Sequence, residues 1–532
     1  MSTHSALRIA ALSVGLVTTP VLAQEHRHDP GEVGSVTFPT SCSAAVQPAF
    51  ERAVAALHSF WFPEAEKGFR DVAAADPSCA MAWWGVAMTR LGNPLAGRPA
   101  PESERIATEA AERAGQVAGG TARERGYIAA VRALYRDAGT ADYRARMQAY
   151  EAAMAEVVRA HPDDPEAAIF HSLAMVANAP PTDLTFARQK RAAEVLNPLF
   201  ARYPDHPGLA HYIIHAYDSP PLAPLALDAA RRYAAIAPAA PHALHMPSHI
   251  FTRLGYWDES IATNARSAET EPTPSGRFHP YDYMVYAFLQ QGRDREALET
   301  IEAAGAEIGE RPGYTFTIIS YNHGAMPARY TLERGAWAEA AALPSPAADV
   351  AEQSYPHAVT HFARAIGAAR SADAAAALRE IALLETIERN LTGRGDAYWA
   401  GVVAAQRLAA SAWAAHAAGD DDAAVRLAAE AAALEDTFEK HPVTPGPILP
   451  ARELEGELLL ELGRHADAVR AFDAALQREP NRARSLFGLA RAAELAGDAV
   501  RARRHYQEFM ALQSKGDGTR AEIQHAQRYP GG

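Results

Sequence analysis

The chain has 532 residues, more than one compact core usually organises, so its length indicates either several domains or a repeat array. Alanine is abundant, aromatic residues make up only 8% and β-branched runs are scarce, a composition that favours closely packed helices over sheets. The formal net charge of −13 predicts a surface that repels nucleic acid and anionic lipid, which excludes both as expected partners.

The N-terminus has the pattern of a secretory signal peptide. Arg8 precedes an apolar run from Ile9 to Val17, and the run is followed by a proline, Pro20, and then by Val21-Leu22-Ala23. This run is shorter than the roughly 20 residues that cross a bilayer, so a membrane anchor is not favoured. We expect a signal peptide over residues 1–23, cleavage near Ala23, no membrane span, and a periplasmic or secreted mature protein.

Residues 24–44 form an N-terminal extension that contains one of the two cysteines of the chain. Cys42 lies in this extension and Cys79 lies near the first expected repeat. In an oxidising compartment such a pair predicts one disulfide, while two buried free thiols are the alternative.

Internal repeats run through most of the remaining chain. In the middle, three segments open with two prolines separated by two residues, at Pro162, Pro204 and Pro238. The first proline ends one helix and the second begins the next. Near the C-terminus, Gly463 and Gly497 mark two similar segments that are 34 residues apart.

This period and its residues resemble the tetratricopeptide repeat family. The consensus small, aromatic, small and proline positions are matched by Ala468, Phe472, Ala475 and Pro480. The first expected repeat also matches the family, through Phe62, Ala65, Phe69 and Pro77. The resemblance implies an all-α superhelical solenoid of about twelve helix pairs over residues 45–515, followed by a C-terminal tail, 516–532. Loops Gly92–Pro101 and Thr444–Pro450 are expected to be ordered insertions or breaks.

Segments such as DPSCAMAWWG and HALHMPSHIFTRLG further resemble a bacterial family of exported, histidine-rich repeat proteins. That resemblance implies fold and export, with no activity attached. In tetratricopeptide repeats the first helix of each pair lines a concave groove, which is the expected binding surface.

Two histidine pairs occupy equivalent places in successive repeats. His211 and His215 are four residues apart, as are His245 and His249, and the pairs are offset by 34 residues. With His242, they fall at positions that face the groove in the resembled family. We therefore expect these five imidazoles to meet across two adjacent helices.

A transition-metal site is the main hypothesis for this cluster, because imidazoles suit Zn, Cu, Ni or Fe whereas Mg and Ca prefer oxygen. The alternative is that the histidines bond to backbone carbonyls and pack against aromatic rings. The HExxH glutamate is absent, so a zinc-protease mechanism is not implied.

Other polar residues are candidates for the same groove. His279 is a further candidate outside the two histidine pairs. For Glu453 and Glu457, a solvated helix surface is the alternative. The groove candidates are Asp218, Arg253, His58, His361, His416, Glu453 and Glu457.

Two functions follow from these features. The first is binding of a protein, a peptide or a small ligand in the concave groove, with a histidine-lined metal site as its chemical elaboration. The alternative is a metalloenzyme, a hydrolase or an oxidoreductase, that uses the groove histidines. No nucleotide-binding loop, GxSxG elbow or CxxCH haem motif is present in the sequence.

Overall fold

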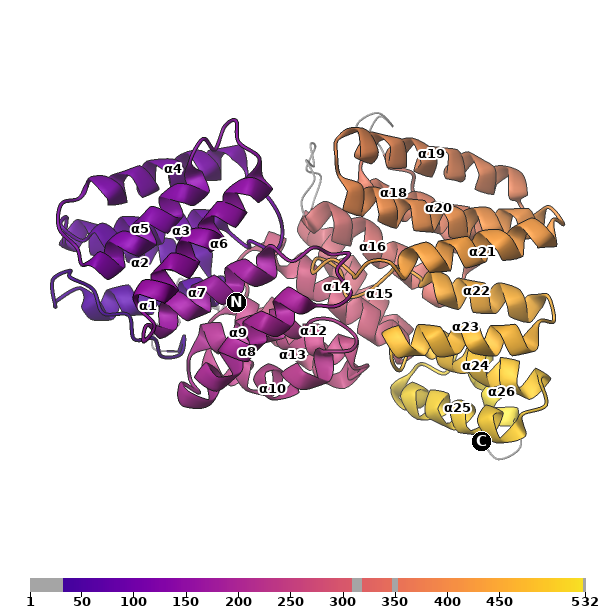
Figure 1. Cartoon of the computed structure of the whole chain (residues 1–532). Helices are drawn as coiled ribbons and strands as arrows, with labels where there is room; N and C mark the ends of the chain where they lie inside the picture. The colour runs from indigo at the N-terminus through magenta and orange to yellow at the C-terminus, as the bar shows by residue number, and fades with distance from the viewer. Residues whose placement is uncertain (1–31, 309–317, 347–352, 530–532) are drawn as a thin grey trace, which may run out of the picture.

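The computed structural model describes residues 32–308, 318–346 and 353–529, and all regular structure within these ranges is helical. The predicted signal peptide, residues 1–23, lies outside the described residues. Helices α1 to α26 follow one another with short connections, and most form antiparallel pairs (Figure 1).

The N-terminal half of the described chain contains six pairs. The sixth has a divided first helix, and a short 3-10 turn, Ala223–Ala226, precedes α10. The pairs are α1 (Gln47–His58) with α2 (Phe62–Ala75), α3 (Ala80–Leu91) with α4 (Pro101–Gln116), α5 (Ala122–Tyr135) with α6 (Tyr143–Ala160), α7 (Pro165–Ala177) with α8 (Ala187–Arg202), α9 (Pro207–Tyr217) with α10 (Leu227–Ile236), and α11 (Pro241–His245) plus α12 (Pro247–Arg253) with α13 (Trp257–Thr270).

The C-terminal half of the described chain contains six more pairs and a last helix. Helix α26 (Ala521–Arg528) falls in the predicted C-terminal tail and packs against α25. The pairs are α14 (Pro274–Gln290) with α15 (Asp294–Ile308), α16 (Ile318–Glu333) with α17 (Trp337–Ala341), α18 (Tyr355–Arg370) with α19 (Ala374–Gly393), α20 (Ala397–Ala417) with α21 (Asp421–Glu435), α22 (Ala451–Glu461) with α23 (His465–Arg478), and α24 (Ala483–Leu495) with α25 (Ala499–Leu512).

The pairs stack into a solenoid of the tetratricopeptide-repeat type, which confirms the predicted fold class. First helices of neighbouring pairs contact one another, as α7 contacts α9 and α14 contacts α16, so they form the inner layer. Small residues allow close packing: Phe472 of α23 lies against Gly456 of α22 and Gly488 of α24, where a Cβ would collide with its ring. The consensus aromatic position of Phe472 thus acts through steric fit against two helical glycines.

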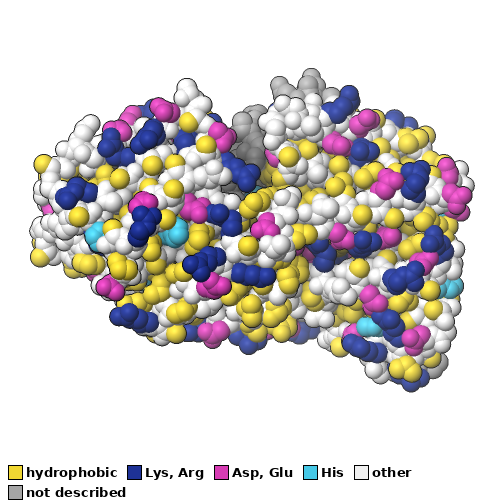
Figure 2. Space-filling model, in the orientation of Figure 1, with side chains coloured by type: hydrophobic (Ala, Val, Ile, Leu, Met, Phe, Trp, Pro, Cys, Tyr) yellow, Lys and Arg dark blue, Asp and Glu magenta, His cyan; other side chains and the backbone are white. Residues whose placement is uncertain are grey.

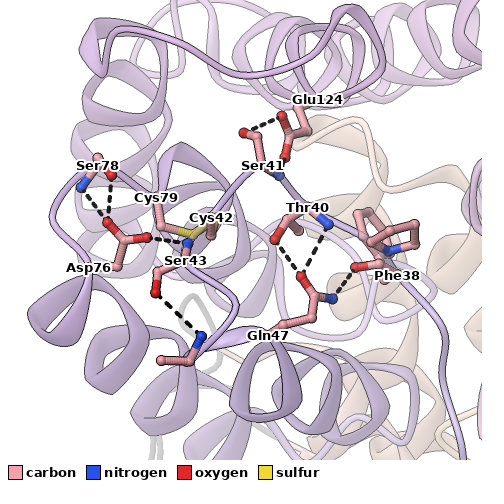
Figure 3. The surroundings of a disulfide bond; sticks show 12 residues. Phe38, Thr40, Ser41, Cys42, Ser43, Gln47, Asp76, Ser78, Cys79 and Glu124 are labelled. Atoms are coloured by element: carbon pink, nitrogen blue, oxygen red, sulfur yellow. Dashed lines mark hydrogen bonds between the residues drawn. A yellow bond between two sulfur atoms is a disulfide. The ribbon is translucent and has the colours of Figure 1, made fainter.

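The N-terminal extension is tied to the repeats by the disulfide between Cys42 and Cys79 (Figure 3). Around it, Ser43 N donates to Asp76 at 2.7 Å and Ser41 N donates to Glu124 at 2.6 Å. Ser35 N donates to the backbone carbonyl of Asp205, just before α9. The extension therefore connects the first repeats with the turn that leads into the histidine-bearing helices.

A second non-repeat segment, residues 438–450, connects α21 to α22, and we call it the strap. It crosses the inner layer: Glu439 N donates to Pro181 O, and Arg329 of α16 donates to the carbonyls of Gly446 and Pro447. Residues 443–446 are buried. The concave surface is therefore covered at its centre by the chain itself, which the sequence did not lead us to expect.

The surface carries both signs of charge. On the face in Figure 2, Lys and Arg side chains are interspersed with Asp and Glu, and few histidines are visible. None of the described helices combines the length and apolar character needed to cross a bilayer.

Candidate metal centre

Two prolines and one glycine shape the backbone around the histidines. Pro207 begins α9, and Pro247 divides the next inner helix into α11 and α12, because proline has no N–H to donate to the preceding turn. A Cβ at Gly208 would lie 2.5 Å from His58 Nδ1, so glycine is needed for the close approach of that ring. Helices α1 and α9 therefore contact each other although they belong to repeats far apart in the chain.

Six histidines gather in one place, on the inner helices of three consecutive repeats: α9, the divided helix α11 and α12, and α14. Their side chains are buried or half-buried, and neighbouring rings lie 4.4 to 6.0 Å apart between centroids. They form two triads whose three ligand atoms lie within 4.8 Å of one another. The first triad is His211, His215 and His242, and the second triad is His245, His249 and His279.

His279 is the member that sequence reasoning ranked too low. It follows His245 by 34 residues, as His245 follows His211, so the repeat register contained the necessary signal. The histidines at equal repeat positions form two columns, one through His245 and one through His249. In the second column, the residue 34 after His249 is Tyr283, whose hydroxyl donates to the strap at Thr444 O. The histidine columns thus end at α14.

In the second triad, His245 and His249 turn the same ring nitrogen toward each other. Their Nε2 atoms lie 3.0 Å apart. His245 Nδ1 donates to Asn264 Oδ1 at 2.6 Å, and the orientation of this amide is set because Asn264 Nδ2 donates to Ser260 O. His249 Nδ1 donates to Asp218 Oδ2 at 2.8 Å. Both neutral rings therefore carry their proton on Nδ1, and two Nε2 lone pairs face each other.

The first triad also has two facing ring nitrogens, but they come from two neighbouring repeats. His211 Nδ1 donates to the backbone carbonyl of His58 at 2.6 Å, which leaves His211 Nε2 as an acceptor 3.2 Å from His242 Nε2. His215 Nε2 is buried without a hydrogen-bond partner, as is His279 Nδ1 in the second triad. Each triad therefore combines a facing pair of nitrogens with one unpartnered nitrogen.

Burial lowers the pKa of all six rings. For every ring except His249, the second-largest effect is a neighbouring imidazole, which lowers the pKa further. For His249 the second-largest effect is the hydrogen bond to the Asp218 carboxylate, which raises the pKa and partly opposes the decrease. The rings are therefore neutral at pH 7, and neutral imidazole is the form that binds a metal ion.

Asp218, at the end of α9, holds His249 in place and joins the site to the strap. Its carboxylate also accepts from Arg253 Nε at 2.9 Å and from Lys440 Nζ at 3.2 Å. Burial opposes ionisation, but Lys440, Arg253 and His249 together hold the pKa of Asp218 well below its usual range. Arg253 in turn donates to Glu439. The two predicted residues Asp218 and Arg253 thus lie beside the cluster and support it.

His58 belongs to a separate group with Glu166 and His206. Both carboxylate oxygens of Glu166 accept from these rings, His58 Nε2 at 2.9 Å and His206 Nε2 at 2.8 Å. Although burial opposes ionisation, the two rings lower the pKa of Glu166 to about 2. His58 Nδ1 is 3.0 Å from the Tyr212 hydroxyl. Because both nitrogens of His58 have partners, this group is a hydrogen-bond network that positions His211.

A cavity of about 500 Å³ lies beside both triads. Five of the six histidines line it, all except His211. Aromatic side chains, the predicted loop Gly92–Pro101 and the first part of the strap complete the wall. These further lining residues include Phe60, Phe62, Asn93, Ala96, Met246, Tyr355, His441, Pro442 and Val443. A small molecule in this cavity would be in contact with both histidine groups.

Two other predicted groove histidines lie outside the cluster. His361 of α18 is buried and bonds to Glu380 at 2.7 Å and to Gln353 at 2.9 Å. His416, at the end of α20, bonds to Asp421 at 2.7 Å. Neither is part of a triad.

The two predicted glutamates are paired with arginines. Glu453 accepts from Arg482 at 2.7 and 3.0 Å, and both side chains are fully buried. Glu457 accepts from Arg370 and Arg484, each at 2.5 Å. The solenoid therefore uses these carboxylates to join its C-terminal repeats, and not as partners of the histidines.

Comparison with protein-family models gives no match, and comparison with curated proteins gives none either. Among solved structures, the chain resembles a human IFIT1 dimer with PPP-AAAA (10% identity, TM-score 0.38, covering 81% of this chain and 90% of that one) and yeast Tom70 (10%, 0.32, 91% and 95%). It also resembles the Cut9–Hcn1 complex (12%, 0.31, 90% and 89%). Similarity at this level gives no indication of function.

Proposed function

We propose that this protein is an extracytoplasmic metalloprotein that binds a transition metal through the buried histidine triads. The observation that carries the proposal is the pair of facing Nε2 atoms, 3.0 Å apart, on His245 and His249. With both protons held on Nδ1, these lone pairs repel each other unless a cation lies between them.

The spacing of the facing atoms suits a shared ion. Two nitrogens bound to one ion at 2.0–2.1 Å with a tetrahedral angle lie about 3.3 Å apart. The facing pairs lie 3.0 and 3.2 Å apart. Asn264 and Asp218 fix the ligand rings through Nδ1, as the partners of metal-bound histidines commonly do. Zn, Cu, Ni and Fe all suit imidazole donors.

A metalloenzyme, acting as a hydrolase or an oxidoreductase, is the second candidate function. The cavity favours it, because a small substrate placed there would reach the ligand side of both triads. The strap makes a small ligand more suitable than an extended peptide at the centre of the groove. We propose protein or peptide binding only for the parts of the concave surface that the strap leaves uncovered.

Export is part of the proposal. It is supported by the signal-peptide pattern of residues 1–23 and by the disulfide between Cys42 and Cys79, which suits an oxidising compartment. Cell fractionation of the full chain tests it: the mature protein should appear outside the cytoplasm and begin near Gln24.

Elemental analysis of protein purified without a polyhistidine tag tests metal binding. The apo protein is reconstituted separately with Zn, Cu, Ni and Fe and desalted before measurement. We expect stoichiometric binding of at least one of these metals by the wild type and its loss in the double variant His245→Ala, His249→Ala.

The matched control is His416→Ala, which removes a histidine that bonds to Asp421 outside the cluster and should keep the metal. Sub-stoichiometric metal in the wild type with all four elements would overturn the proposal.

A further inference from the structure

The two triads lie in adjacent repeats and are built alike, although they are not exact copies: His279 follows His245 by 34 residues, whereas Gly276 stands 34 residues after His242. In each triad, two histidines four residues apart come from the inner helix of one repeat, and the third comes from the inner helix of the next repeat. The first triad joins His211 and His215 with His242, and the second joins His245 and His249 with His279. Each triad has one facing nitrogen pair, His211 with His242 in the first and His245 with His249 in the second, and one unpartnered nitrogen. The 34-residue period therefore duplicates the pair of histidines four residues apart, and an imidazole from the following repeat completes each set of three ligands.

A single ion cannot use all six rings. Nitrogens bound to one ion at 2.0–2.1 Å lie at most about 4.2 Å apart. Within each triad the ligand atoms lie within 4.8 Å of one another, close to this limit. The six histidines together do not form one group of that size. At the same time, the triads adjoin: the rings of His242 and His245 are 5.9 Å apart between centroids, and those of His215 and His249 are 6.0 Å apart.

We infer that this protein holds a pair of neighbouring transition-metal ions, one in each triad, with their open coordination positions facing the shared cavity. The inference rests on the proposed function and adds to it the number of ions and their arrangement. Members of both triads line the cavity, so one small ligand there would contact both ions.

The donor set makes copper the best-fitting element. Neither triad contains a thiolate or a carboxylate, so the ligands themselves do not compensate the charge of two ions. Because Coulomb repulsion scales with the product of the charges, two divalent ions repel about four times as strongly as two monovalent ions at the same separation. Copper binds imidazole and is stable as a monovalent ion. A divalent pair would require an anion between the ions, for which the cavity provides room.

The test combines metal counting with electron paramagnetic resonance. Tag-free apo protein is loaded anaerobically with Cu(I), desalted and analysed, then oxidised with ferricyanide. We expect two copper ions per chain in the wild type. The oxidised wild type should give less resonance signal than its copper content, because two Cu(II) ions bridged by a ligand couple their unpaired electrons.

One half-buried ligand from each triad is then removed. His242→Ala and His279→Ala should each retain one copper ion and give the full signal of an isolated Cu(II), with an unchanged circular dichroism spectrum. The control His416→Ala should behave as the wild type.

The alternative results are distinguishable. No copper in the wild type would refute the copper pair, and only the failure of Zn, Ni and Fe as well would refute the proposed function. One ion in the wild type, lost in both variants, would leave metal binding intact and refute the pair. Two ions with the full uncoupled signal would refute the shared ligand position.

Discussion

Replacing Asp218 by asparagine should weaken the middle of the solenoid and the metal site together. Asparagine keeps an acceptor for His249 Nδ1 but removes the charge that pairs with Arg253 and Lys440. The side chains of Asp218, Arg253 and Lys440 are 7%, 2% and 4% exposed, so these are buried ion pairs. Breaking a buried pair costs about 3 to 5 kcal/mol, because the remaining charge is left uncompensated.

We expect the lower end of this range, about 3 kcal/mol, because Arg253 keeps its second partner, Glu439. Repeat arrays do not unfold in one step, so the measurement is native-state hydrogen exchange of the backbone amides in α9 and α12. Metal affinity, measured by competition with a chelator, should fall about 10- to 100-fold, the usual effect of removing a partner of a ligand histidine.

The control is Asp436→Asn, which removes one of the two carboxylate partners of Arg452 at a site where the Asp436 side chain is 34% exposed. That change should cost less than about 1 kcal/mol, because surface ion pairs are weak. An opening free energy of α9 and α12 that stays within about 0.5 kcal/mol of the wild type in Asp218→Asn would refute the assigned role of the carboxylate.

Three further predictions concern the scaffold. Cys42→Ser opens a disulfide loop spanning 37 residues and should lower the opening free energy of the first repeats by about 4 kcal/mol, measured by hydrogen exchange in α1 to α3. Burial raises the pKa of Glu435 to about 7 from its ordinary 4.5, so its contribution to stability is complete below pH 4.5 and is lost as the pH rises through 7. In denaturant titrations, Glu435→Gln should remove this pH-dependent loss. Its free energy of unfolding should rise relative to that of the wild type by on the order of 1 to 2 kcal/mol between pH 5 and 8. A difference between the two proteins that does not change with pH would contradict the assignment. Gly85→Ala would force a Cβ into the Phe69 ring and should cost about 1 to 3 kcal/mol by thermal unfolding, whereas Gly305→Ala meets no atom within 4 Å in α15 and should stabilise the helix by about 0.5 to 1 kcal/mol.

The sequence by itself determined the fold class and most of the histidine cluster. A 34-residue period requires stacked helix pairs, because one pair cannot bury its apolar face alone. The same period places side chains with equal repeat positions in columns, so the meeting of His211 and His215 with His245 and His249 followed from spacing. His242 was included through its groove-facing position in the resembled family. Extending the column by one more period would have included His279 with equal weight.

Only the tertiary structure decided what surrounds the rings. Asn264 and Asp218 orient His245 and His249 by contacts between helices, and Lys440 reaches Asp218 from a segment 222 residues away. Helix periodicity is a local property that a sequence displays directly, whereas contacts across the inner layer depend on how the small angles between successive pairs accumulate. That accumulation brings the strap over the histidines and closes a cavity where the repeat pattern alone predicted an open groove.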